Sequence, residues 1–413
     1  MSSIFNRTVG NTQNLLRSYE EILGDISSVA KNLREKFLED GTILEIPDLS
    51  DKEAGLTSLC AIDGASASEK MQSADLLIAG SSLHDGARSK PLFLGTEIEP
   101  PSLSYSDIRI HSSKNDEILS AMRAFTEIYV LGMAPHDVSI IDGAYLGNFL
   151  TVLYKLQEST QTSERIIEFL REDTEGYFNL GLQKIFDMEL KARTGKEVVA
   201  LAKSDSSRDM VKEYTDGASF FVTDKILAEY LLQPGEMLLP LSVKANKDKV
   251  SMLEYDKGKK NWSGFRWNPY KTLSTEDFKV VEKFFTFGKK DSDKDLFSLY
   301  TYLYDFKSYH YTYFKPTRFT AGSHALRLEF TTEGINRNIP SSLQHRIDKA
   351  SELVGYVNAD VVTAAVKEPY SQFMVDKAVK MPVSASIKQI KASIPSLMNS
   401  ANNPMGMVSS YRS

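Results

Sequence analysis

The sequence predicts an α/β fold with a mixed β-sheet flanked by helices. Short apolar runs with strand character occur at 61–66, 74–83 and 138–142, and the stretch 115–131 between them has apolar residues at helical spacing. The order strand, strand, helix, strand is typical of a mixed sheet covered by helices. With 413 residues the chain can bury a large core, and we expect one large domain with extensions and an insertion.

Composition narrows the class of protein. The chain is 42% hydrophobic and 25% charged, and no apolar run approaches the roughly 20 residues that span a bilayer. Its start lacks the pattern of a signal peptide, and the single cysteine excludes an internal disulfide. We therefore expect a cytoplasmic protein without a membrane segment. A net charge of −6 does not exclude nucleic acid, because one basic groove or a metal ion suffices for binding.

The remaining elements follow from periodicity and turn residues. We expect residues 1–48 to form an N-terminal extension whose segment 11–38 is an amphipathic helix, ended by Gly41 and Pro47. Further strands are expected at 108–110 and 198–203, and a helical stretch begins near 220–225 and ends at Pro234.

An inserted segment is expected at about 243–275. Six lysines lie between Lys244 and Lys260, and both tryptophans, Trp262 and Trp267, follow. Basic residues interleaved with aromatic ones can follow phosphates and stack on bases, whereas the alternative is a hairpin with its own aromatic cluster. Both interpretations stay open.

Two later segments have a distinctive composition. Aromatic residues alternate at period two between Tyr300 and Phe314, which predicts a strand pair with an aromatic face in the core, in a subunit interface or against nucleic acid. Residues 382–413 are rich in Ser, Ala, Asn and Met, and we expect a mobile or partner-bound tail with a short helix near 387–397.

Two strand-like runs end in Asp-Gly-Ala, at Asp63 and at Asp142. A strand with a terminal Asp and a turn glycine places a carboxylate at a sheet edge, where several can converge on a divalent cation. Glu127 lies on the helix just before the second strand, and acids at strand ends with one helical Glu are the arrangement of the ribonuclease H fold. Glu127 on a solvated helix face and Asp-Gly as an ordinary turn are the alternatives.

Other catalytic signatures are absent from the sequence. The six histidines form no His-x-x-x-His pair, and one cysteine makes no zinc knuckle. The chain has no Walker A loop and no Gly-x-Ser-x-Gly elbow. Cys60 lies in the apolar run before Asp63 and is a poor nucleophile candidate.

The ordered motifs resemble the NurA nuclease family between about Leu59 and Met381. The segments that carry the resemblance are 61–64, Glu127, 140–143, 202–207, 223–225 with 234–236, 326–329, and 369–370 before 375–377. The resemblance implies a ribonuclease H-like nuclease domain at 49–381 and 5′–3′ exonuclease and endonuclease activity on DNA that depends on Mn²⁺, with Mg²⁺ as the alternative cation. It further implies a homodimer that processes DNA ends with a HerA-type hexameric ATPase, in a nucleoid-associated setting.

The resemblance also implies site residues. Asp63, Glu127 and Asp142 match the family's metal-binding acids, and Asp376 matches its late His or Asp ligand. Lys203 matches a lysine near the site, as a catalytic phosphate contact or as a salt-bridge partner of an acid. Further candidates for DNA contact are Arg208, Trp262 and Trp267, whereas Arg327 with Glu329 is expected to be a structural pair. In the family, tyrosines precede the last metal ligand, and Glu368 occupies the position of the first of them in this chain. The role of that tyrosine therefore has no counterpart here.

Two other functions compete with this interpretation. Asp63-Gly64 is also compatible with the phosphate turn of an actin-like or sugar-kinase-type ATPase, although the second half lacks an evident Gly-Gly adenosine motif. A non-catalytic dimeric adaptor for DNA or an ATPase is the third possibility, and it does not require the four acids.

Overall fold

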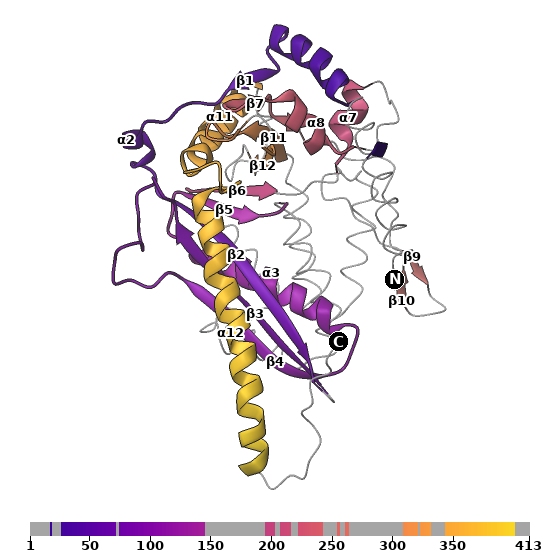
Figure 1. Ribbon diagram of the computed structural model, residues 1–413, viewed down its shortest axis with the longest axis vertical. Helices are drawn as coiled ribbons and strands as arrows, with labels where there is room; N and C mark the ends of the chain where they lie inside the picture. Colours follow the sequence, from indigo (N-terminus) through magenta and orange to yellow (C-terminus); the bar gives the residue numbers. More distant parts are fainter. Residues whose placement is uncertain are drawn as a thin grey trace, which may run out of the picture.

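A computed structural model describes residues 17–18, 26–71, 74–144, 195–202, 207–215, 222–242, 254–256, 261–263, 309–320, 323–331 and 343–400. Its main feature is a ten-stranded mixed sheet with helices on both faces (Figure 1). The strand order is β1-β7-β11-β12-β6-β5-β2-β3-β4, and β8 pairs with β11 outside this path. The strands are β1 Ile43–Glu45, β2 Leu59–Lys70, β3 Ala74–Asp85, β4 Ser102–Ile110, β5 Val138–Asp142, β6 Glu197–Ala202, β7 Glu236–Leu238, β8 Leu241–Ser242, β11 Tyr309–Lys315 and β12 Leu326–Thr331.

The centre of the sheet is mixed in direction. Strand β5 pairs in parallel with both β2 and β6, and the other pairs of the sheet are antiparallel. Since β5 accompanies β2 only from Leu59 to Ile62, the rest of β2 runs on beyond the end of β5. Asp63 is the first residue of β2 past this pairing.

Two helices cover the long β2–β3–β4 hairpins from opposite faces. Helix α3 (Asn115–Met133) lies behind the strands in Figure 1, and α12 (Tyr370–Ser400) crosses in front of them. Two acidic residues occupy the first turn of α3, which favours its helix dipole, and Pro135 follows its end. Successive residues of a strand point to opposite faces of the sheet. Gly64 of β2 faces α3, whereas Glu69, an odd number of residues later, points to the opposite face and binds Lys391 of α12.

Helix α12 corrects the expected tail. The helix is 31 residues long and continues through Pro382 to Ser400, so residues 382–400 are helical and not a tail of irregular structure. Val375, Val379, Val383 and Ile387 recur every four residues and are buried in the core with the sheet. Packing of this stripe therefore outweighs the hydrogen bond that a proline removes from a helix interior.

The core has two parts. The larger cluster lies between the central strands, α11 (Leu343–Ala359) and α12. The second lies around α7 (Asp209–Tyr214), α8 (Asp224–Leu231) and a helix at 26–39, which buries Ile26, Ala30 and Phe37. Part of the predicted N-terminal extension thus contributes to the core, and β1 belongs to the main sheet.

The described part of the inserted segment is a two-stranded hairpin. Strands β9 (Glu254–Asp256) and β10 (Asn261–Ser263) pair with each other in a sheet of their own. The aromatic segment contributes a single described strand, β11, which lies inside the main sheet; Tyr313 and Phe314 are fully buried. Its core placement agrees with one of the expected alternatives, and residues 300–308 lie outside the described part of the chain.

Candidate metal centre

Asp63 lies within a continuous strand. The sequence interpretation of Gly64 as a turn is wrong, because β2 runs on for six residues beyond it. Glycine is instead required by a close approach: a Cβ at position 64 would lie 2.6 Å from Oε1 of Glu127. The Asp63 side chain is 8% exposed, and its Oδ1 accepts a hydrogen bond from the Gly64 N–H at 2.8 Å.

Glu127 comes to this strand from helix α3. It is 6% exposed and hence not on the solvated helix face that was the alternative. Burial and the charges of Asp63 and Asp142 raise its pKa to about 8, although Arg123 one helical turn earlier acts in the opposite direction. The Arg123 Nε lies 3.5 Å from Glu127 Oε1. The three acids are therefore close enough to interact electrostatically.

Asp142 ends strand β5, as the sequence predicted. The following Gly143 has φ +89°, a backbone conformation that favours glycine. Oδ1 of Asp142 accepts a hydrogen bond from Nε2 of Gln372 in α12 at 2.9 Å. This contact ties the end of β5 to α12, and Gln372 is a residue that the sequence interpretation missed.

Asp376 lies one helical turn after Gln372. Two contacts place α12 along β2: the Tyr370 ring lies 5.7 Å from that of His84, whose strand partner is Ala61, and Lys391 Nζ lies 2.6 Å from Glu69. A rise of about 1.5 Å per helical residue and about 3.3 Å per strand residue then places Asp376 level with Asp63. In the present arrangement Asp376 pairs with Lys380 at 2.5 Å.

The donor set suits a hard divalent cation. Carboxylate oxygens from β2, α3, β5 and α12 are the ligands that Mg²⁺ and Mn²⁺ prefer. Within the described ranges, however, no three Asp, Glu, His or Cys side chains are already gathered in a geometry that could hold an ion.

Of the other predicted residues, only some can be located. Lys203 and Trp267 lie outside the described residues, and for Trp262 the structure describes the strand β10 without its side chain. Arg208 immediately precedes α7, whose Met210 and Val211 belong to the second core cluster together with residues of β11. Arg327 pairs with Glu329 at 2.8 Å and stacks over Tyr311, as expected for a structural pair.

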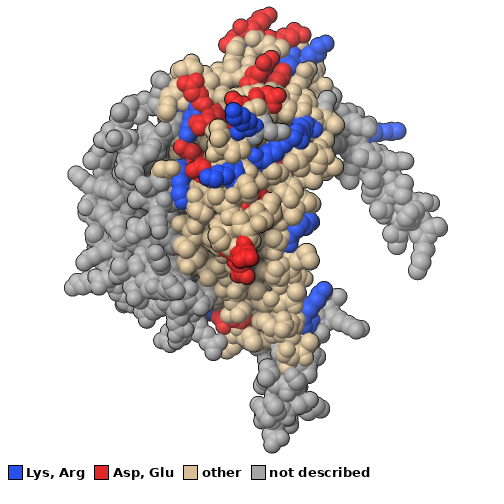
Figure 2. All heavy atoms as spheres, turned by 90° about the vertical axis from the view of Figure 1, so that its left-hand side faces the viewer, with Lys and Arg blue, Asp and Glu red and all other residues tan. Residues whose placement is uncertain are grey.

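Basic side chains on the described surface gather in the upper part of the face in Figure 2 and along one flank of α12. On the face in Figure 2, acidic and basic side chains gather in the upper part, and the lower part of the described surface carries isolated charges. Lys377, Lys380, Lys388 and Lys391 are spaced so that they share one flank of α12, the flank on which Lys391 binds Glu69 of β2. On the other flank a cavity of about 530 Å³ is lined by small residues of β3, β4 and α12.

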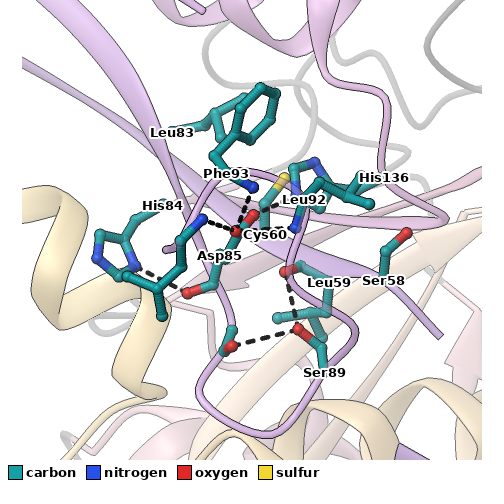
Figure 3. A network of polar contacts seen from close by, with 12 residues as sticks. Ser58, Leu59, Cys60, Leu83, His84, Asp85, Ser89, Leu92, Phe93 and His136 are labelled. Carbon is teal, nitrogen blue, oxygen red and sulfur yellow. Dashed lines mark hydrogen bonds and ion pairs between the residues drawn. The ribbon is translucent and has the colours of Figure 1, made fainter. Parts of the chain in front are cut away.

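A polar network fixes the end of β3 (Figure 3). Oδ2 of Asp85 accepts hydrogen bonds from the backbone N–H groups of residues 92–94 at 2.6–3.0 Å, and Oδ1 lies 2.6 Å from Nε2 of His136. Burial raises the pKa of the neighbouring Cys60 thiol to about 12, and its Sγ lies 3.5 Å from Ser139 Oγ. Cys60 is thus structural, in agreement with the sequence prediction.

None of the helices in the described part of the chain combines the length and apolar character of a bilayer-spanning segment.

Comparisons with known proteins identify the fold. No protein-family model and no curated protein sequence matches the chain. Among solved structures, the NurA nuclease from Sulfolobus solfataricus matches with a TM-score of 0.53 and 12% identity, over 98% of this chain and 100% of that one. NurA bound to dAMP and manganese matches with a TM-score of 0.50 and 11% identity, over 93% of this chain and 97% of that one. The chain has the fold of the NurA nucleases, which confirms the predicted ribonuclease H-like α/β class.

Proposed function

We propose that this chain is a metal-dependent DNA nuclease in which Asp63, Glu127 and Asp142 hold the cation and Asp376 joins them when it is bound. The observation that carries the proposal is the close approach of Glu127 from α3 to β2 beside Asp63, where a Cβ on Gly64 would lie 2.6 Å from Glu127 Oε1. Burial, together with the nearby charges of Asp63 and Asp142, raises the pKa of Glu127 to about 8. A buried cluster of acids is costly for folding unless a cation or a proton neutralises it. Strongly shifted acids of this kind are typical of functional sites.

Each residue has a defined task in phosphodiester hydrolysis. Bound Mn²⁺ or Mg²⁺ would supply Lewis acidity and lower the pKa of water. Asp63 and Asp142 fix the position of the positive charge from neighbouring strands, and Gly64 leaves room for Glu127. Glu127 would add its carboxylate to the cation, which would neutralise the buried charge that raises its pKa in the metal-free protein. We assign to Lys203 the phosphate contact, one of its two predicted roles, and to Asp376 the role of late ligand.

The finer biological role rests on the resemblance to NurA. We propose 5′–3′ exonuclease and endonuclease activity, a homodimer, and DNA end processing with a HerA-type hexameric ATPase. The similar structures include one of NurA bound to dAMP and manganese, which supports a nucleotide substrate and manganese as the cation.

The test is cleavage of end-labelled single- and double-stranded DNA by the purified chain with Mn²⁺, Mg²⁺ or EDTA. We expect Mn²⁺-dependent shortening in the wild type and a loss of at least about 100-fold in Asp63→Asn and Asp142→Asn. Asp107→Asn is the matched control, since Asp107 is also 8% exposed but lies on the edge strand β4. Full cleavage by Asp63→Asn contradicts the site. DNA binding in EDTA without cleavage in any metal, even with an added ATPase, favours the adaptor function.

A further inference from the structure

Gln372, in the first turn of α12, has a buried side-chain amide oxygen that accepts no hydrogen bond from the described part of the chain. Its side chain is 0% exposed, and Oε1 has no hydrogen-bond partner among the described residues. A buried amide oxygen without a partner costs free energy, so native proteins rarely retain one without a reason. We therefore expect Oε1 to contact a hydrogen-bond donor or a cation in the active protein.

The orientation of this amide follows from chemistry. The group 2.9 Å from Gln372 is Oδ1 of Asp142, and an ionised carboxylate only accepts hydrogen bonds. The amide must therefore present its NH₂ group to Asp142, and rotating it by 180° would set two oxygen acceptors against each other. Oε1 is consequently committed to the other side, where it needs a hydrogen-bond donor or a cation.

The neighbours of Gln372 are the candidate ligands themselves. Asp142 is in direct contact, and Asp376 lies four residues later on the same face of α12. Side-chain amide oxygens are common ligands of hard divalent cations, alongside carboxylates. A neutral oxygen donor also adds a ligand without adding to the repulsion between the acids.

We propose that Gln372 belongs to the metal site: its Nε2 holds Asp142 in place, and its Oε1 completes the oxygen donors for the divalent cation. This inference rests on the proposed function, because it needs a cation at the carboxylates. It assigns two linked roles to one side chain, which the motif resemblance does not cover.

The test compares Gln372→Leu and Gln372→Glu with the wild type. Mn²⁺ binding is measured from the loss of the free Mn²⁺ EPR signal, and thermal unfolding is measured in EDTA and in Mn²⁺. We expect Gln372→Leu to bind Mn²⁺ about 10- to 100-fold more weakly, the range found when a supporting residue of a metal site is removed. In EDTA we expect its unfolding temperature to be equal or higher, because the unsatisfied oxygen is gone.

Two comparisons separate the donor role from a packing role. Gln372→Glu keeps an oxygen donor, so we expect it to bind Mn²⁺ at least tenfold more tightly than Gln372→Leu. Gln389→Leu, on the exposed side of the same helix, should match the wild type. If Gln372→Leu binds Mn²⁺ as tightly as the wild type, the inference about Gln372 is overturned while the proposed function stands. The same holds if Gln372→Glu binds Mn²⁺ no more tightly than Gln372→Leu. A wild-type chain that binds no Mn²⁺ contradicts the proposed function and this inference together.

Discussion

Replacing Gly64 with alanine should damage the site far more than the fold. The new methyl group would lie 2.6 Å from Glu127 Oε1 and 2.7 Å from Ser81 Oγ. Ordinary contacts to a Cβ begin near 3.4 Å, so Glu127 Oε1 must retreat by about 0.8 Å, and Ser81 Oγ and Arg123 Cγ, at 2.7 and 2.9 Å, by about 0.7 and 0.5 Å. The Glu127 carboxylate is the end of a flexible chain and moves the most. Ser81 is buried and bonded to Thr126 Oγ1 at 2.6 Å, so its smaller shift accounts for most of the cost in stability.

The displacement translates into lost activity. A misplacement of about 1 Å at a reacting centre can cost on the order of 100-fold in rate, so we expect Mn²⁺-dependent cleavage to fall by about 10- to 100-fold. The free energy of unfolding should change by only about 1 kcal/mol, because alanine suits a strand better than glycine and offsets part of the crowding. The assays are cleavage of end-labelled DNA and thermal unfolding of the same preparations.

Gly80→Ala on the neighbouring strand β3 is the matched control. A Cβ there lies no closer than 3.4 Å to Leu103 O, which is an ordinary contact, and its activity should stay near that of the wild type. If Gly64→Ala folds and cleaves DNA at the wild-type rate, Glu127 is not part of the reacting centre and the reasoning is refuted.

Three further predictions follow from pKa shifts and surface charge. Because folding raises the pKa of Glu127 from 4.5 to about 8, its charge destabilises the metal-free protein increasingly as pH rises through this window. Glu127→Gln should therefore unfold at a higher temperature than the wild type at pH 9 in EDTA, yet lose cleavage; an unchanged unfolding temperature contradicts the shift. The buried Cys60, whose pKa is raised to about 12, should resist a thiol reagent until the protein unfolds, and rapid labelling of the folded protein would be inconsistent with this. Charge reversal at Lys377 and Lys388 should weaken DNA binding and reduce the slope of log K against log salt by roughly 2 if both contact phosphates; an unchanged slope excludes this flank of α12 as a DNA contact.

The strands that carry the candidate acids were predictable because their signals are local. Apolar runs ending at Asp142, and the helix 115–131, give the correct elements to within a few residues. The turn inferred at Gly64 failed because a glycine that permits close packing looks the same in sequence as one that permits a turn. Only the approach of Glu127 from α3, more than sixty residues away, distinguishes the two.

The length of α12 and the role of Gln372 needed the structure. Pro382 and a Ser/Ala-rich composition argue locally against a helix, although valines at 375, 379 and 383 carried a usable signal at intervals of four. Gln372 has no motif, and its importance comes from a single contact with a strand 230 residues earlier. Contacts of such separation depend on topology, which no short pattern encodes.

The most direct test of the central claim is an anomalous diffraction map of crystals grown with Mn²⁺, recorded at the manganese absorption edge. We predict one or two peaks within about 2.0–2.6 Å of carboxylate oxygens of Asp63, Glu127 or Asp142. Peaks only at other positions, or none at millimolar Mn²⁺, would contradict the assignment of these acids as the metal centre.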